Sequence, residues 1–375
     1  MDFDRPAPDD PRRLAVRAWV AAHSSTGGPT AGELAASGYA APHWPAPWGC
    51  DADPDEQVII DEELDAAGVV RPDNPIALGW AGPTIVAGGT PEQQQRWLPG
   101  ILDGSASWCQ LFSEPEAGSD LASLRTRAER DGDTYVVNGQ KIWSTWADRS
   151  DWGILLARTD GDAPPHRGIS YFVLDMRSPG VEVRPIVEMT GGNHFNETFL
   201  TDVRIPVDQR IGPEHGGWRL AKVTLGNERV SLSDGGVLWG MGPTSDEVMA
   251  EVRRIGVADP VRRQQVARVH TEALVIRLLG HRIMTAMQQS GEPGPFASVR
   301  KTLADEHGQH LMALVRDLHG TDALVGRQDH HAEELDPWHW GYLFSRALTI
   351  GGGTSEVQRD IIAEQLLGLP REPRA

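Results

Sequence analysis

The sequence predicts a multidomain α+β protein: a helical N-terminal domain, then a central antiparallel β-domain, then a C-terminal four-helix bundle. Two observations predict this class. The hydrophobic period is helical, shortens to two residues, and becomes helical again along the chain. A chain of 375 residues is also too long for one compact core. The changes of period place the domains at residues 1–106, 107–215 and 216–375.

Helical spacing runs from Pro11 to about Gly104 in the first domain. Residues Gln57–Ala67 carry apolar side chains at helix-like intervals. Thr90 precedes Pro91 and an acidic first turn, which is typical of a capped helix start.

The central region, from Trp108 to about Pro213, alternates with a period of two. The expected strands are Thr134–Val137, Trp152–Ala157, Ile169–Asp175, Val181–Val187 and Glu197–Ile205. Because they are short and separated by Gly, Asp or Pro turns, we expect an antiparallel sheet or barrel.

Long helical stretches return after Gly217 and predict the C-terminal bundle. They are Trp218–Val252, Asp259–Gln289, Ala297–Leu324 and Glu333–Leu367.

Charge and cysteine content argue against several classes of protein. A formal net charge of −18 is unfavourable for binding nucleic acid or an anionic membrane surface. No apolar run reaches the ~18 residues of a membrane span, and the first residues do not form a signal peptide. Cys50 and Cys109 make no disulfide framework, which fits a reducing compartment. We therefore expect a cytoplasmic protein.

Four motifs occur in order along the chain. They are Ser113–Asp120 (SEPEAGSD), Asn138–Thr145 (NGQKIWST), Asn196–Phe199 (NETF) and Gly351–Arg359 (GGGTSEVQR). Together they resemble the flavin and thioester site of the acyl-CoA dehydrogenase family, and the resemblance runs from about residue 30 to Arg371. It implies an FAD cofactor, an acyl-CoA substrate and that family's three-domain order.

The first motif implies contacts to the cofactor. By resemblance, Phe112 and Ser113 donate hydrogen bonds to the flavin ring, and Ser119 contacts the cofactor or the acyl-CoA. Gly118 can adopt a positive φ and lets backbone N–H groups approach a ligand.

The second motif supplies an aromatic ring and a hydroxyl. Trp143 beside the flavin would shield it from water, and Thr145 lies two residues on, so both share a face if the strand stays extended. The alternative for Trp143 is an interior side chain that fills the sheet.

The last motif is a glycine-rich turn that opens a helix, which suits a pyrophosphate or a flavin edge. Gly353 lies in this turn. By resemblance, Thr354 and Glu356 occupy positions that hydrogen-bond the cofactor, often that of a neighbouring subunit.

The catalytic base is the main departure from the family pattern. Gly352 stands where many members carry their catalytic glutamate, and it is expected at the substrate. Other branches place the glutamate before an arginine on the first bundle helix, which Glu228 and Arg229 match. Glu228 shares one helix face with Leu225 and Leu232, where a glutamate is unusual. The alternative is a structural glutamate paired across the bundle. With Glu228 as the base, Arg229 would orient the site from beside it.

An Arg-x-x-Phe-Gly segment that binds a partner's flavin in the family is missing, because Arg253–Gly256 reads RRIG. His307, His310 and the pair His330–His331 lack further ligands in the sequence, so no metal is expected.

The sequence thus predicts α,β-dehydrogenation of an acyl thioester, with electrons passing to an external acceptor such as an electron-transfer flavoprotein. Glycines around position 352 would leave room for a bulky or branched acyl group, polycyclic ones included. Two rivals stay open: a non-catalytic subunit of a heteromer, and a desaturase or oxidase acting on a carrier-protein thioester. Apolar bundle faces predict a homo- or hetero-oligomer.

Overall fold

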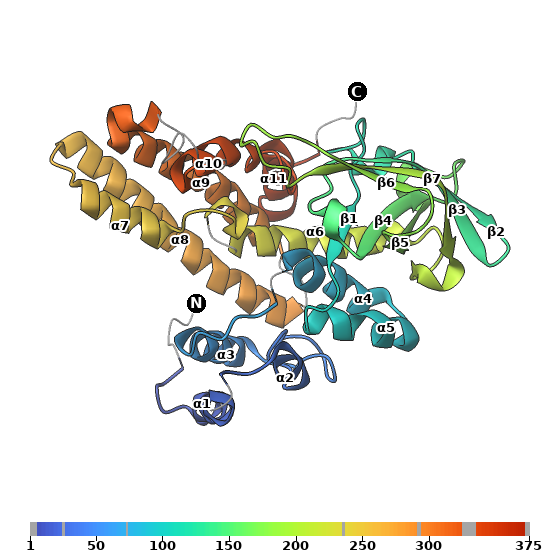
Figure 1. Cartoon of the computed structure of the whole chain (residues 1–375), viewed down its shortest axis with the longest axis horizontal. Helices are drawn as coiled ribbons and strands as arrows, with labels where there is room; N and C mark the ends of the chain where they lie inside the picture. The colour runs from blue at the N-terminus through green and yellow to red at the C-terminus, as the bar shows by residue number, and fades with distance from the viewer. Residues whose placement is uncertain are drawn as a thin grey trace. The chain divides into compact units, whose positions relative to one another are not determined.

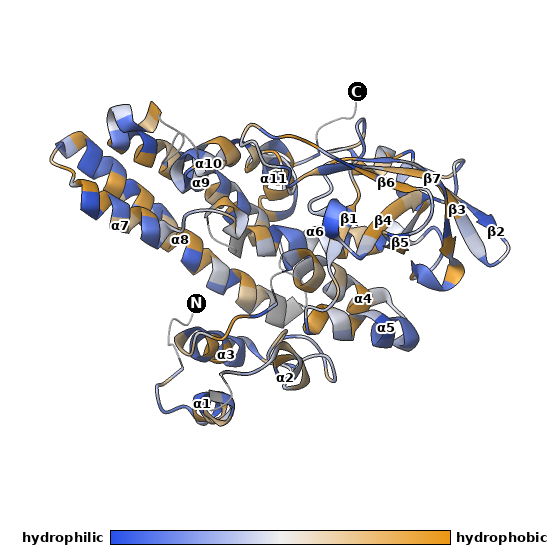
Figure 2. Ribbon diagram, viewed as in Figure 1, coloured by the Kyte–Doolittle hydropathy of each residue, from blue (hydrophilic) through white to orange (hydrophobic). Residues whose placement is uncertain are grey.

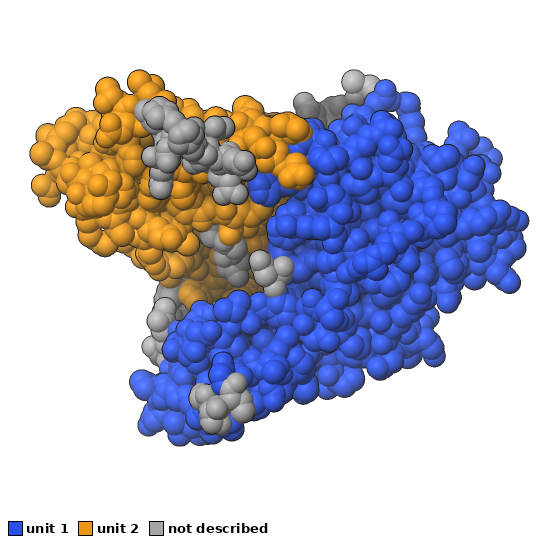
Figure 3. Space-filling model, in the orientation of Figure 1, with its two compact units in different colours: residues 1–186, 194–224 blue, residues 187–193, 225–375 orange. Residues whose placement is uncertain are grey.

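The computed structural model describes residues 6–24, 27–72, 74–234, 237–290, 294–324 and 335–371. The chain forms two compact units, one of residues 1–186 and 194–224, the other of residues 187–193 and 225–375 (Figure 3). Helices precede and follow a sheet along the chain (Figure 1), so the expected α+β class is confirmed. The three domain ranges stay a prediction.

Short helices make up the N-terminal part of the first unit. They are α1 (Pro11–Ser24), α2 (Ala31–Ala36), α3 (Pro54–Ala66), α4 (Gly82–Gly88) and α5 (Pro91–Leu102). The predicted helix start at Thr90 is confirmed, because its side chain accepts from the Gln93 N–H while the Gln93 side chain accepts from the Thr90 N–H at 2.9 Å. Helix α3 covers the stretch predicted from Gln57 and buries Ile59 and Leu64.

An eight-stranded sheet follows in the described part of the same unit, with strand order β6-β7-β3-β2-β4-β5-β8 and β1 beside β4. The strands are β1 (Trp108–Leu111), β2 (Arg127–Asp131), β3 (Thr134–Lys141), β4 (Trp152–Arg158), β5 (Ile169–Asp175), β6 (Val181–Pro185), β7 (Asn196–Pro206) and β8 (Arg210–Ile211). All five predicted strands are present, as β3 to β7.

Most pairings are antiparallel, but two are not. Strand β1 runs parallel to β4 from Trp108↔Trp152 onward, and β2 meets β4 in parallel at Arg127↔Arg158. Parallel neighbours need a long connection, and β2 and β3 supply it because they lie between β1 and β4 in the sequence. Alternating hydrophobicity does not reveal strand direction, so the purely antiparallel expectation was too simple.

The sheet core lies around β4 and β5, which are buried along nearly their whole length and show as hydrophobic in Figure 2. The Tyr135 ring of β3 meets the Phe172 ring of β5 edge-on, with centroids 5.0 Å apart. Strands buried on both faces read as continuous apolar runs, as β4 and β5 do.

The C-terminal helices are α6 (Gly217–Asp234), α7 (Ser245–Ile255), α8 (Pro260–Ser290), α9 (Phe296–His319), α10 (Pro337–Phe344) and α11 (Ser355–Ile361). Helix α6 begins in the first unit and enters the second at Leu225. Within the second unit, α9 packs against α7, α8, α10 and α11. Among the described helices, none combines the length and the apolar character needed to cross a bilayer.

The first predicted bundle helix, Trp218–Val252, is interrupted. Leu238 and Trp239 have φ of +61° and +57°, which an α-helix cannot contain. The helical period continues past this point, so the sequence reading missed the break. Helix α7 then restarts behind Thr244, whose side chain caps the Glu247 N–H.

The last predicted helix is also interrupted. Its expected start at Glu333 lies outside the described residues. Helix α10 ends at Phe344, and α11 starts only at Ser355. Gly352 and Gly353 between them adopt φ of +64° and +86°, which regular helix cannot contain.

Candidate active site

The first motif forms the loop after β1 in the first unit. Phe112 is buried, and its ring meets the Tyr171 ring edge-on at 5.9 Å between centroids. The Ser113 carbonyl accepts a hydrogen bond from the Ile142 N–H at 3.0 Å. The loop is thereby tied to the end of β3.

Gly118 and Ser119 lie at the exposed tip of this loop. Gly118 has no positive φ, so the conformational reason given for it is wrong. A Cβ there would meet no described atom within 4 Å. Glycine at this position therefore leaves the backbone open to approach.

A buried ion pair that the sequence reasoning missed holds the loop in place. Glu114 accepts from Lys141 Nζ at 2.8 Å and from the backbone N–H groups of Arg125 (2.6 Å) and Thr126 (2.9 Å). Burial lowers the pKa of Lys141 to about 8, although Glu114 opposes this. Burial alone would raise the pKa of Glu114, but the Lys141 charge and these hydrogen bonds hold it below its usual value. Both groups are therefore charged at neutral pH.

Trp143 lies just beyond β3, which ends at Lys141. Its φ is +61°, so the argument that Trp143 and Thr145 share the face of an extended strand is wrong. The indole is 57% exposed and meets the Phe195 ring edge-on at 6.0 Å, so the interior alternative does not hold either. Thr145 is half-buried in the turn that follows.

The NETF motif at the start of β7 holds this turn. Asn196 and Ser144 exchange backbone hydrogen bonds of 3.0 and 3.1 Å, and the Asn196 Nδ2 donates to the Ser144 carbonyl at 3.1 Å. Asn196 and Ser144 are both fully buried. The exposed indole of Trp143 is thus carried on a well-anchored backbone.

Glu228 and Gly352 lie side by side in the second unit. Glu228 is buried on α6, with 8% of its surface exposed. A Cβ on Gly352 would lie 3.6 Å from Glu228 Oε1, 2.6 Å from Leu232 Cδ1 and 3.0 Å from Lys301 Cε. The Glu228 carboxylate therefore reaches the space that a side chain at 352 would enter.

Arg229 follows Glu228 on α6 and is half-buried. Burial lowers the pKa of its guanidinium, while the Glu228 charge acts in the opposite sense. An arginine titrates far above neutrality, so Arg229 remains a cation next to the candidate base.

A second buried ion pair, also missed from the sequence, lies against the same turn. Lys301 on α9 is fully buried, and its Nζ donates to Asp305 Oδ2 at 2.6 Å and to the Leu348 carbonyl at 3.3 Å. Asp305 is 2% exposed. Burial raises the pKa of Asp305 to about 6, although Lys301 lowers it.

The glycines at 351 and 352 do not leave empty space. A Cβ on Gly351 would lie 2.5 Å from the Trp239 ring, which itself meets the Phe344 ring edge-on at 5.6 Å. Position 352 is filled by Leu232, Lys301 and Glu228. The prediction that these glycines make room for a bulky acyl group is therefore wrong, and a bulky acyl group cannot be inferred from them.

The glycine turn is held by a residue to which the sequence reading gave no role. The fully buried Gln358 donates through Nε2 to the carbonyls of Gly352 (3.1 Å) and Gly353 (3.2 Å). Thr354 caps α11 by accepting from the Val357 N–H at 3.3 Å. Two of the candidate cofactor residues, Gly353 and Thr354, thus belong to one fixed turn.

Glu356 points to the surface, with its side chain 77% exposed and 3.7 Å from Arg359. Arg253–Gly256 forms the end of α7, where the Gly256 N–H donates to the Val252 carbonyl at 3.1 Å. In the described structure this segment therefore ends a helix.

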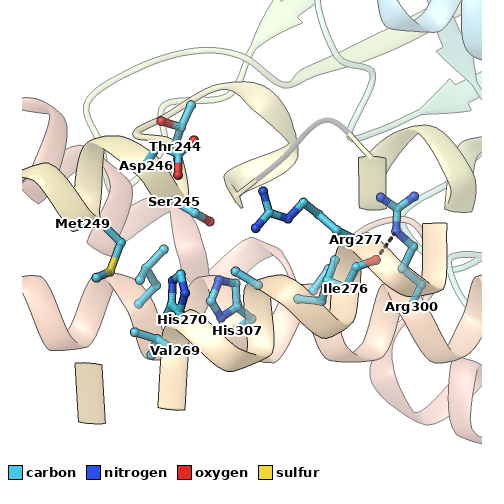
Figure 4. A pocket seen from close by; sticks show the side chains of 13 residues that line it. Thr244, Ser245, Asp246, Met249, Val269, His270, Ile276, Arg277, Arg300 and His307 are labelled. Atoms are coloured by element: carbon cyan, nitrogen blue, oxygen red, sulfur yellow. Dashed lines mark hydrogen bonds between the residues drawn. The ribbon is translucent and has the colours of Figure 1, made fainter. Parts of the chain in front are cut away.

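A cavity of about 280 Å³ opens between α7, α8 and α9 (Figure 4). Its lining includes Met249, His270, Arg277 and His307, and none of the predicted site residues. His307 is bound to Glu272 at 3.1 Å, and burial lowers its pKa against the effect of that carboxylate. Within the described residues, no cluster of His, Cys, Asp and Glu is able to hold a metal ion. His330–His331 lie outside them.

Comparison with known proteins identifies the class that this fold and these motifs define. Models of the N-terminal, middle and C-terminal domains of acyl-CoA dehydrogenase match residues 13–105, 109–203 and 215–367. The chain belongs to the acyl-CoA dehydrogenase family, whose members are flavoprotein oxidoreductases.

Particular relatives come from mycobacteria. Acyl-CoA dehydrogenase FadE34 of Mycobacterium tuberculosis is 43% identical over 90% of this chain, which spans only 46% of that protein. Acyl-CoA dehydrogenase IpdE1 of the same organism is 39% identical over 91% of this chain and 87% of its own length.

Two solved structures match nearly the whole chain. The Tcur3481-Tcur3483 steroid ACAD is 29% identical, with a TM-score of 0.79 over 99% of this chain and 100% of its own. The ChsE4-ChsE5 complex from Mycobacterium tuberculosis is 32% identical, with a TM-score of 0.78 and the same coverage of both chains.

Proposed function

We propose that this chain catalyses FAD-dependent α,β-dehydrogenation of an acyl-CoA thioester, with Glu228 as the base. One observation carries the proposal: the buried Glu228 carboxylate reaches the space beside Gly352, where many family members carry their glutamate. A subunit that had lost its base would not need a carboxylate there. This favours the enzyme over the non-catalytic subunit.

The chemistry sets what Glu228 must do. The proton α to a thioester carbonyl is weakly acidic, so its removal needs a carboxylate that is held in place and kept from water. The Glu228 carboxylate would form the new O–H bond as the Cα–H bond breaks. Bound FAD would accept the hydride that leaves Cβ. Arg229, a neighbouring cation, would favour the ionised base before the proton is taken.

The described residues fit a flavin. Trp143 presents an exposed aromatic ring on an anchored backbone, and the open tip of the preceding loop offers Gly118 and Ser119. We assign cofactor contacts to these residues together with Phe112, Ser113, Thr145, Gly353, Thr354 and Glu356. The last three would contact FAD of this subunit or of a neighbour.

We propose a bulky or branched acyl group, polycyclic ones included. This proposal is supported by the relative described as a steroid ACAD. The glycines at 351 and 352 do not support it, because both are packed against side chains. Ser119 and Gly352 are assigned to the substrate. A preference for straight short-chain acyl-CoAs, or activity only with carrier-protein thioesters, would contradict this part.

We also propose that the working assembly is an oligomer containing a related subunit. Two relatives were solved as two-component proteins, and the Arg-x-x-Phe-Gly segment that binds a partner's flavin is absent here. Electrons would leave through an external acceptor such as an electron-transfer flavoprotein.

The test is anaerobic bleaching of the visible flavin band by acyl-CoAs of varied bulk, with wild type and Glu228→Gln purified side by side. Wild type should bleach, and the variant should bind flavin but bleach at least 100-fold more slowly. Equal bleaching would remove Glu228 as the base. Purified wild type without flavin, even with a co-expressed related subunit, would favour the non-catalytic alternative.

A further inference from the structure

Lys301 and Asp305 form a charged pair that the proposed reaction does not yet use. Both lie on α9, four residues apart, and are 0% and 2% exposed. A buried ion pair is costly to desolvate and seldom stabilises a fold more than apolar side chains of the same size would. Its presence in the core of the second unit therefore needs a reason beyond packing.

The place of the pair supplies that reason. Lys301 Cε lies 3.0 Å and Glu228 Oε1 lies 3.6 Å from the same point, the Cβ position of Gly352. The distance between Lys301 Cε and Glu228 Oε1 is therefore at most the sum of those two distances. The Lys301 Nζ is fixed from two sides, by Asp305 and by the Leu348 carbonyl.

Other charged groups lie near this pair or follow the candidate base in the sequence. Arg229 follows Glu228 on α6. On α9, Glu306 also acts on Asp305, but it is bound to Arg359 of α11 at 3.0 Å near the surface. Lys301, which borders the same point as Glu228, is buried together with its partner Asp305.

We propose that Lys301 and Asp305 are positioning residues for Glu228: the lysine stem forms the wall beside its carboxylate, and the pair sets the charge that this carboxylate experiences. The inference rests on the proposed function for its catalytic meaning, but the physical coupling is independent of it. Lys301 favours the ionised form of Glu228, and Asp305 opposes it by neutralising Lys301 and by its own negative charge.

Two isosteric changes should then act in opposite directions. Asp305→Asn leaves the Lys301 charge less compensated, so Glu228 should titrate about half to one pH unit lower. Lys301→Met removes the cation and leaves a carboxyl, so Glu228 should titrate higher by a similar amount. A purely structural defect would not produce shifts of opposite sign.

The experiment follows the Glu228 carboxyl by 13C NMR in glutamate-labelled protein, with its signal assigned by loss in Glu228→Gln. Glu63→Gln is the matched control, because Glu63 is also buried in an ion pair, 2.6 Å from Arg13, but on α3. The control should leave the Glu228 midpoint unchanged. The acid limb of anaerobic flavin bleaching should move with the NMR midpoint in each variant.

Unmoved midpoints in both variants, or shifts of the same sign, would overturn the proposal. If Lys301→Met does not fold, the Asp305→Asn shift decides alone, since Lys301 keeps two hydrogen-bond acceptors in that variant. The two proposals fail separately. If the NMR shifts are opposite but Glu228→Gln is active, only the catalytic role of Glu228 is contradicted. If Glu228→Gln is inactive but no shifts occur, only the positioning role of Lys301 and Asp305 is contradicted.

Discussion

Gly352→Ala tests the packing around the candidate base. The new Cβ would lie 2.6 Å from Leu232 Cδ1 and 3.0 Å from Lys301 Cε, on a backbone with φ of +64°. The positive φ costs about 1 kcal/mol, and overpacking a core position costs a further ~1–3 kcal/mol. We expect the free energy of unfolding to fall by about 2–4 kcal/mol in all. The rate of flavin bleaching should fall at least tenfold, because Leu232 and Lys301, which share this space with the Glu228 carboxylate, must shift.

Gly132→Ala is the matched control for this change. Its φ is +60°, but a Cβ there would meet no described atom within 4 Å. Gly132→Ala should therefore lower the free energy of unfolding only by the cost of the positive φ, about 1 kcal/mol, and leave the bleaching rate unchanged. Urea unfolding followed by circular dichroism measures both variants. Equal stability of the two variants, together with wild-type bleaching by Gly352→Ala, would refute the reasoning.

Three further predictions concern charge and the flavin surface. Lys141→Met should lower the free energy of unfolding in urea by ~3–5 kcal/mol, because it leaves Glu114 buried without its cation. The control Glu116→Ala removes an exposed ion pair with Arg125, in which the side chains of Glu116 and Arg125 are 73% and 80% exposed. It should change the free energy of unfolding by under ~0.5 kcal/mol. An equal effect of the two would contradict this. Trp143→Ala should leave stability near wild type, since the ring is 57% exposed, and should weaken FAD binding roughly tenfold by fluorescence titration; unchanged affinity would remove Trp143 from the cofactor site. Burial raises the pKa of Asp305 in the folded protein to about 6, above its ordinary value of 3.8, so its contribution to stability is full below pH 3.8 and is lost as pH rises through 6. Asp305→Asn should remove this loss, and urea midpoints that depend on pH as in wild type would argue against it.

The fold class was predictable because helical and alternating periods report directly on which residues face a core. Strands β4 and β5 are buried along nearly their whole length, and their apolar runs stand out in the sequence. The two helix breaks were not predictable in the same way. Residues 238 and 239 continue an apolar pattern, and only the structure shows their left-handed conformation.

The candidate base could be found from the sequence, since a glutamate on an apolar helix face is unusual. The surroundings of the base could not. Lys301 and Asp305 are spaced i, i+4, as any exposed helix pair would be, and nothing in the sequence shows that both are buried. Glu114 and Lys141 are 27 residues apart, and their contact depends on the path of the loop after β1. The side chains that fill the space beside Gly352 are likewise determined by tertiary packing.

The most direct test of the central claim is exchange of the substrate α-proton. Wild type and Glu228→Gln, both loaded with FAD, are incubated anaerobically in D2O with an acyl-CoA analogue that cannot lose a hydride at Cβ, and deuterium at Cα is measured by mass spectrometry. If Glu228 is the base, wild type incorporates deuterium, and the variant does so at least 100-fold more slowly. Equal incorporation by both proteins would mean that another group removes the proton.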